Sequence, residues 1–212
     1  MEQTDNELIH ASIRGDADAF AVLMNRYMQA VYSFAYRLVR NPDGAQDVTQ
    51  ETFIKVWKHR ARFDASHSFK TWLFTIARNT AYDALKKKSA IPFSQWEEYQ
   101  ETQQQYESPR AAESVIADQA PLPDELADAR LQKEYIEKAI ARLPLLYQTV
   151  VLLRYDSDLT FEEIGAVLDI PPNTAKSQYR RAVVKLRDYV SDLIQSNKNT
   201  HPNAYVRRTH II

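Results

Sequence analysis

An acid-free, cationic segment near the carboxyl end of this 212-residue sequence carries side chains that suit binding to a polyanion. Residues 174–187 contain no Asp or Glu, and Lys, Arg, Thr, Ser and Gln recur along them. Lys and Arg pair with phosphates, whereas Thr, Ser, Gln and Arg also form hydrogen bonds with base edges in the major groove of DNA. The segment therefore predicts a DNA-binding surface. Its candidate residues are Thr174, Lys176, Ser177, Gln178, Arg180, Arg181, Lys185 and Arg187.

The elements that would position this surface are two helices separated by a sharp break, within residues 160–187. Thr160 and Glu163 have the spacing of a capping box, and Pro171 and Pro172 end the first helix because proline lacks an N–H. In the second helix, Ala175, Tyr179, Ala182, Leu186 and Val190 form an apolar side, opposite Thr174, Ser177, Gln178, Arg181 and Lys185. This pattern predicts a helix-turn-helix whose second helix enters the major groove. An ordinary amphipathic helix with a cationic face is the alternative.

Aromatic, basic and amide side chains share one side of another predicted helix, residues 69–87. That combination suits single-stranded nucleic acid, because rings stack on bases, amides bond to them and cations neutralise phosphates. Ser68 is placed to cap this helix. The alternative is a basic amphipathic helix whose aromatic rings only pack. The candidate contacts are Trp72, Thr75, Arg78, Asn79, Tyr82 and Lys86.

A third helix, predicted at residues 44–60 with Asp43 as its cap, has an unusual outer face. This face combines charged and polar residues with a single apolar one, and comprises Asp47, Gln50, Glu51, Ile54 and Lys58. The predicted inner side comprises Ala45, Val48, Thr52, Phe53, Val56 and Trp57. An exposed Ile among charged residues indicates a docking surface for another protein, although a solvated face with one exposed Ile is the commoner arrangement.

Composition favours an all-α fold and argues against catalysis. Gly occurs only 3 times, and alternating strand-like runs are scarce. Cys is absent, the 5 His residues are scattered and there is no Gly-rich phosphate loop, so we expect no metal, no cofactor and no enzymatic activity. Apolar runs are too short to span a membrane, and the acidic start of the sequence does not resemble a signal peptide. We therefore expect a cytoplasmic protein.

Charge and helical periodicity predict two small helical domains joined by a flexible acidic linker. The net charge is only −1, yet residues 55–88 are strongly basic and residues 91–128 strongly acidic. The linker is predicted at residues 89–123, where Gln, Pro and acids are frequent. The first domain would span residues 1–88, with helices at 4–14, 16–40, 44–60 and 69–87. The second would span residues 124–190, with helices at 124–142 and 145–155 before the helix-turn-helix. Residues 191–212 would then form a disordered tail.

Three stretches together resemble the sigma-70 family of transcription initiation factors. GAQDVTQETFIKVW (residues 44–57) resembles the helix that binds core RNA polymerase, and FKTWLFTIARN (residues 69–79) resembles the helix that contacts the −10 promoter element. LPLLYQTVVLLRYDSDLTFEEIGAVLDIPPNTAKSQYRR (residues 143–181) is similar to the domain that recognises the −35 element. With only these two domains, the sequence resembles the extracytoplasmic-function (ECF) group over about residues 5–88 and 124–190.

The resemblance implies a partner for each surface. Contacts with a coiled coil of the largest polymerase subunit would come from Asp47, Gln50, Glu51 and Ile54. Bases of the −10 element would be captured by Arg78, Asn79 and the loop from Arg62 to Ser68. The −35 element would be recognised by Thr174, Ser177, Gln178 and Arg181, and its phosphates held by Lys176, Arg180 and Arg187. The implied partners are bacterial core RNA polymerase, promoter DNA and an anti-sigma factor, which in this family can be membrane-tethered.

The sequence departs from the family's usual pattern at three positions of the helix-turn-helix. Gln178 stands where Arg is usual, Asp169 where Gly is usual and Ala175 where Val is usual. Because Gln can bond bidentately to adenine, we expect an altered −35 preference. A stand-alone helix-turn-helix transcriptional regulator is the alternative function; it accounts for the second domain but not for GAQDVTQETFIKVW.

Overall fold

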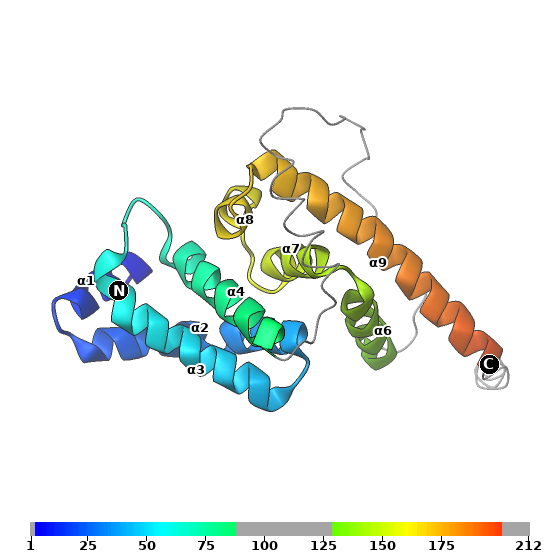
Figure 1. Ribbon diagram of the computed structural model, residues 1–212, viewed down its shortest axis with the longest axis horizontal. Helices are drawn as coiled ribbons and strands as arrows, with labels where there is room; N and C mark the ends of the chain where they lie inside the picture. The colour runs from blue at the N-terminus through cyan, green and yellow to red at the C-terminus, as the bar shows by residue number, and fades with distance from the viewer. Residues whose placement is uncertain (1–2, 88–128, 201–212) are drawn as a thin grey trace, which may run out of the picture.

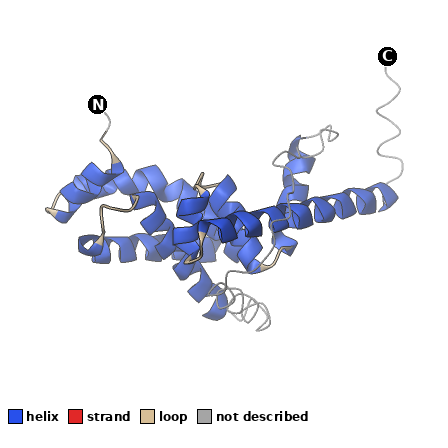
Figure 2. Ribbon diagram, turned by 90° about the horizontal axis from the view of Figure 1, so that it is seen from above, coloured by secondary structure: helices blue, strands red, loops and turns tan. Residues whose placement is uncertain are grey.

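The computed structural model describes residues 3–87 and 129–200, and α-helices dominate this part of the chain (Figures 1 and 2). The helices are α1 (Asp5–Ile13), α2 (Ala17–Val39), α3 (Pro42–His59), α4 (Phe69–Lys87), α6 (Ala129–Arg142), α7 (Leu145–Tyr155), α8 (Phe161–Leu168) and α9 (Pro172–Thr200), with a short 3₁₀ turn at Arg60–Arg62. Within these ranges there is no β-strand, which confirms the all-α prediction. The predicted linker, residues 89–123, lies outside the described residues.

Helices α1 to α4 form a first unit, in which α2 packs against α1, α3 and α4. Its core is aromatic: the rings of Phe34 and Phe74 meet edge to face, with centroids 5.6 Å apart. Local signals set the helix starts: the side chain of Thr4 forms a capping box with Glu7, and Asp16 caps α2.

The start of α3 differs from the prediction. The cap is Asn41, whose carboxamide oxygen accepts a hydrogen bond from the backbone N–H of Gly44 at 2.7 Å, and not Asp43. Pro42 then occupies the first helical turn, where its fixed φ and missing N–H carry no cost. The helix therefore begins two residues before the predicted start.

Helices α6 to α9 form a second unit, in which α9 packs against α6, α7 and α8. Thr160 and Glu163 form the predicted capping box at the start of α8, and Asp169 ends that helix in the left-handed conformation, at φ 59°. The end of α9 corrects the prediction, because the helix continues to Thr200 and residues 191–200 are not a disordered tail. Leu193 and Ile194 explain the extension, since both are half-buried against the core. Residues 201–212 lie outside the described residues.

Gly165 lies where α8 approaches the start of α9. A Cβ added there would sit 2.7 Å from the backbone oxygen of Ile170 and 3.3 Å from the backbone nitrogen of Pro172, so the turn would have to shift. Alanine is normally better than glycine in a helix by ~1 kcal/mol, whereas overpacking costs ~1–3 kcal/mol. We therefore expect Gly165→Ala to lower the free energy of unfolding by about 1 kcal/mol in urea titrations. A more stable variant would show that the turn is looser than described.

The two units pack directly on each other. Helix α4 lies between α3 of its own unit and α8 of the second, and α2 also contacts α7 (Figure 1). The buried apolar side chains form one cluster that runs through both units. Among the described residues, no helix is both long and apolar enough to cross a bilayer.

Candidate protein and nucleic-acid interfaces

The predicted docking face of α3 is exposed to solvent. Asp47, Gln50, Glu51, Ile54 and Lys58 are all exposed. Ile54 is the apolar member and is 43% exposed, while Glu51 pairs with Lys55 one turn on, at 2.9 Å between Oε1 and Nζ. The inner side is buried as predicted except at Trp57, which is 36% exposed. The Trp57 ring instead lies beneath the guanidinium of Arg60, 3.6 Å from the ring centroid, and meets the edge of Phe20.

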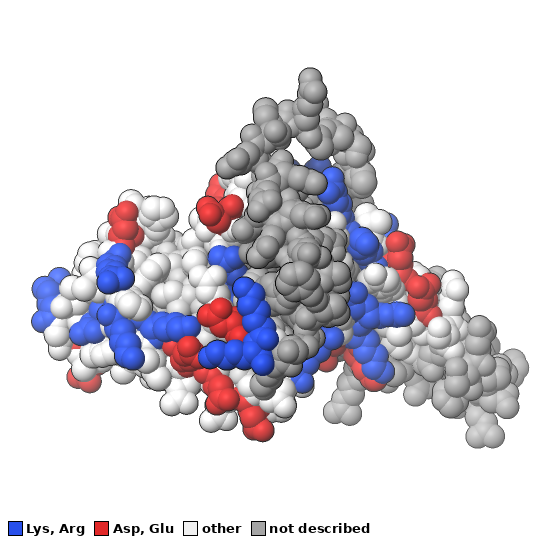
Figure 3. Space-filling view, viewed as in Figure 1, with Lys and Arg blue, Asp and Glu red and all other residues white. Residues whose placement is uncertain are grey.

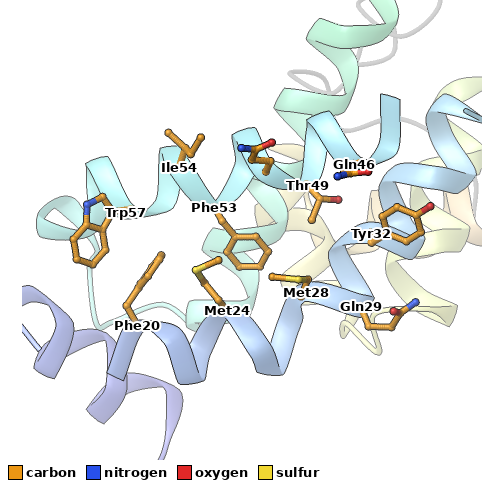
Figure 4. A pocket seen from close by; sticks show the side chains of 11 residues that line it. Phe20, Met24, Met28, Gln29, Tyr32, Gln46, Thr49, Phe53, Ile54 and Trp57 are labelled. Atoms are coloured by element: carbon orange, nitrogen blue, oxygen red, sulfur yellow. The ribbon is translucent and has the colours of Figure 1, made fainter. Parts of the chain in front are cut away.

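A groove of about 770 Å³ runs between α2 and α3 beside this face (Figure 4). Gln50 and Ile54 belong to its lining, so the groove and the docking face are continuous. Most of the lining is aromatic or methionine, including Phe20, Met24, Met28, Tyr32, Phe53 and Trp57. Flexible methionines suit a surface that receives an apolar helix face. Helical spacing within residues 16–40 assigns Phe20 and Met24 to a core stripe and leaves Met28 outside it, so the sequence alone gives no sign of the groove; Met28 is 41% exposed.

The predicted −10 surface on α4 is only partly open. Arg62, Ser68, Asn79 and Lys86 are exposed, Trp72 and Thr75 are half-buried, and Arg78 and Tyr82 are 9% and 5% exposed. Tyr82 lies on the side of α4 that faces away from the core of the first unit. It is nevertheless buried, because the second unit packs against α4 there. The Tyr82 hydroxyl lies 2.7 Å from Oγ1 of Thr149 on α7. The Trp72 ring packs on Phe63, with centroids 5.4 Å apart.

The predicted −35 surface on α9 divides in the same way. Arg181, Lys185 and Arg187 are exposed, and Lys176, Ser177 and Arg180 are half-buried. Thr174 and Gln178, predicted opposite the apolar side, are buried at 8% and 2% exposure. The reason is register: Gln178 stands three residues after Ala175 and four before Ala182, so it borders the buried stripe. Lys and Arg side chains lie over both units on the face shown in Figure 3.

Within residues 3–87 and 129–200, no group of three or more His, Asp or Glu side chains is arranged to hold a metal ion. The carboxylates that the structure engages make structural contacts: Glu163 caps α8, and Asp5 bonds to Tyr27 and Arg26. Burial and the hydrogen bond to Asp5 raise the pKa of Tyr27 well above its ordinary value.

An exposed face of α3 that mixes charged and apolar residues, an aromatic and basic helix and a helix-turn-helix are the features expected of a two-part helical DNA-binding factor that docks on another protein. The family model for sigma-70 region 2 matches residues 23–91, and that for sigma-70 region 4 matches residues 133–186. The ECF RNA polymerase sigma factor SigW of Bacillus subtilis is 32% identical over 91% of this chain and 100% of its own length. The ECF RNA polymerase sigma-E factor of Escherichia coli is 31% identical over 91% of this chain and 97% of its own.

The chain therefore belongs to the sigma-70 family, as a sigma factor of the ECF group, and directs promoter-specific transcription initiation by RNA polymerase. This confirms the family and function predicted from the sequence. The region 2 match also covers the half of the chain that a stand-alone helix-turn-helix regulator does not explain.

Solved structures have the same fold. The structure of CnrH in complex with the cytosolic domain of CnrY aligns with a TM-score of 0.63 at 22% identity, and covers 92% of this chain and 99% of that one. The sigma factor RpoE of Bartonella quintana, in complex with the anti-sigma factor NepR, aligns with a TM-score of 0.57 at 23% identity, over 81% of this chain and 96% of that one.

Proposed function

We propose that three surfaces divide the work of initiation, with no catalytic step on this chain. The face of α3 binds core polymerase, α4 and the turn before it hold the −10 strand, and α9 recognises the −35 element. The observation that carries this assignment is the exposed Ile54, set among charged residues at the edge of an apolar groove. Because the factor works on core polymerase, its site of action is the cytoplasm.

The polymerase contact combines an apolar anchor with acidic flanks. Ile54 and the groove offer apolar surface to a partner helix, while Asp47 and Glu51 are exposed beside them. This arrangement favours a partner helix that carries bulky apolar and basic side chains. A coiled coil of the largest polymerase subunit, implied by the resemblance, is the partner we propose.

The DNA contacts combine cations for phosphates with polar groups for bases. On α4 and the preceding turn, Arg62, Asn79 and Lys86 are exposed for the first encounter with the −10 strand. On α9, Arg181, Lys185 and Arg187 are exposed and supply much of the phosphate and groove contact. Most of the binding energy from such cations is independent of sequence and falls with salt.

Arg180→Ala is expected to weaken holoenzyme binding uniformly across promoter sequences. Arg180 is half-buried at the side of α9, where its charge can neutralise one phosphate. The plot of log affinity against log salt should become shallower by about 1, which titrations at several salt concentrations measure. Arg14→Ala, an exposed arginine in the first unit, is the control and should leave the slope unchanged. A loss confined to particular −35 sequences would instead assign Arg180 to base recognition.

An anti-sigma factor is a further partner that we propose. CnrH and the RpoE of Bartonella quintana are both described in complexes, with the cytosolic domain of CnrY and with the anti-sigma factor NepR. The shared fold supports a binder of the same kind here, and a membrane-tethered one would hold the factor at the membrane.

Run-off transcription over a randomised promoter library tests the proposed function. With core polymerase, the factor should select templates that share a −10 and a −35 element at fixed spacing. Without polymerase, it should bind duplex promoter weakly. Tight and specific binding of duplex promoter by the factor alone would support a stand-alone regulator and count against the three-surface assignment.

A further inference from the structure

One side chain joins the docking face of α3 to the helix assigned to the −10 strand. The ammonium of Lys55 donates to Oγ1 of Thr80 on α4 at 3.1 Å, and it also pairs with Oε1 of Glu51 at 2.9 Å. Helices α3 and α4 pack against each other within the first unit (Figure 1). This ammonium therefore bridges two elements to which we assign different partners.

Lys55 lies at the edge of the docking face and not within it. With 3.6 residues per turn, its side chain is rotated by about 80° around α3 from the centre of that face. Trp57 and Gln50 lie on the opposite edge, where they line the groove with α2. Lys55 is half-buried, whereas Glu51 and Ile54 beside it are exposed. Its ammonium is thus directed toward α4 and away from the proposed polymerase contact.

Thr80 connects this ammonium to the −10 surface. Its side chain is only 1% exposed, and it directly follows the exposed Asn79. Buried threonines elsewhere in the two units donate to the backbone oxygen four residues earlier in their own helix, as Thr49, Thr52 and Thr149 do. Thr80 instead accepts from Lys55, so its hydroxyl ties α4 to the neighbouring helix.

The bond between Lys55 and Thr80 is suited to hold α4 in place. A hydrogen bond from a charged donor is stronger than one between neutral groups, and burial of the Thr80 hydroxyl makes its loss costly. Hydrogen bonds from a carboxamide to a base weaken steeply when distance or direction is wrong. A side chain that recognises a base therefore needs neighbours that fix its helix, and Thr80 stands next to Asn79.

We propose that Lys55 is a positioning residue for −10 recognition: through Thr80 it fixes α4 so that Asn79 meets its base. The inference rests on the proposed function, since Asn79 is taken to contact the −10 strand. Lys55 belongs to the helix that binds polymerase, yet its loss should reduce discrimination among −10 bases and leave polymerase binding intact.

Two substitutions remove the bond from its two ends. Lys55→Met retains an unbranched apolar side chain and removes the ammonium, while Thr80→Val removes the hydroxyl at nearly constant volume and without a change of charge. The matched control is Lys138→Met on α6. Lys138 also pairs with a glutamate one turn earlier, Glu134, at 2.6 Å between Nζ and Oε1. Asn79→Ala serves as the reference, because it identifies the −10 position that Asn79 recognises.

Competition binding by holoenzyme tests the proposal. The probes are the promoter selected by the randomised library and variants of it, each with one altered −10 base. We expect Lys55→Met and Thr80→Val each to reduce discrimination about fivefold, most strongly at the position identified by Asn79→Ala. The double variant should lose no more than either single one, because both remove the same bond.

Affinity for core polymerase, measured by titration of labelled factor, is the second readout. It should not fall in Lys55→Met, because loss of the ammonium leaves the Glu51 carboxylate free for a partner. The Lys138→Met control should match the unsubstituted chain in both measurements.

Four results would overturn the positioning role. They are unchanged discrimination in Lys55→Met, additive losses in the double variant, a fall in polymerase affinity, and an equal loss on every −10 variant. In the last case a salt slope shallower by about 1 would make Lys55 a phosphate contact.

The unsubstituted holoenzyme and Asn79→Ala separate this inference from the proposed function. If Asn79→Ala discriminates among −10 bases as well as the unsubstituted chain does, the assignment of Asn79 is wrong and the role of Lys55 falls with it. If Asn79→Ala loses discrimination while Lys55→Met retains it, only the role of Lys55 is wrong.

Discussion

Replacing Ile54 with glutamate is expected to weaken binding to core RNA polymerase by at least about thirtyfold, equivalent to ~2 kcal/mol. Ile54 is exposed at the edge of the groove that contains Met24 and Met28 (Figure 4). A carboxylate there would have to be desolvated against apolar side chains, and it would add to the negative charge of Asp47 and Glu51. Titration of labelled factor with core polymerase measures the loss, and run-off transcription should fall in parallel.

Val22→Glu is the matched control for Ile54→Glu. Val22 is 46% exposed, close to the 43% of Ile54, but it lies on α2 outside the lining of the groove. It should bind polymerase with unchanged affinity and fold normally. If both variants lose affinity equally, the added charge and not the α3 surface is responsible, and the docking assignment fails.

Helix starts and stops were predictable because their causes lie within a few residues. The pairs Thr4 with Glu7 and Thr160 with Glu163 form capping boxes from chemistry that the sequence displays directly. The exposed face of α3 was predictable for a similar reason, since helical periodicity alone separates Ile54 from Val56. The start of α3 was wrong by two residues because Asn41 and Asp43 are both good caps, and Pro42 favours the earlier one.

Burial at the margins of a helix was not predictable, because it depends on which element packs there. Trp57 was assigned to the core by phase, yet no helix covers it fully, and Arg60 and Phe20 supply its contacts. Tyr82 was assigned to an open face, yet Thr149 from a distant part of the chain meets its hydroxyl. The length of α9 likewise depends on a surface for Leu193 and Ile194 that only the folded second unit provides.

The groove and the contacts between the two units could not be predicted from the sequence, because they depend on how the helices pack. Met28 is apolar and outside the core stripe of its helix, which is a weak sign of a surface role in the sequence. Its partners across the groove, Ile54 and Phe53, come from the next helix, and nothing in the sequence fixes that pairing. The contact of Glu163 with Ser68 of the first unit is even harder to predict, because the role of Glu163 in the capping box already accounts for its presence in the sequence.

Gln178→Ala is expected to reduce holoenzyme binding by ~1–3 kcal/mol on promoters that carry the preferred base pair at one −35 position. Glutamine can bond bidentately to adenine, so the loss should be confined to promoters with an A·T pair there, and selectivity at that position should relax. Competition binding against a set of −35 variants, each with one altered base pair, measures both effects.

The burial of Gln178 makes a stability measurement an essential part of this test. At 2% exposure, its carboxamide must leave its present surroundings before it can bond to a base, and its truncation can also disturb the packing of α9 against Ala175 and Ala182. Urea titration of the free variant measures that packing cost, which is the same for every promoter. Base recognition predicts a further loss that varies with the −35 sequence. An equal loss on all −35 variants would assign Gln178 to the packing of α9 and leave Arg181, exposed one turn further on, as the residue to test next.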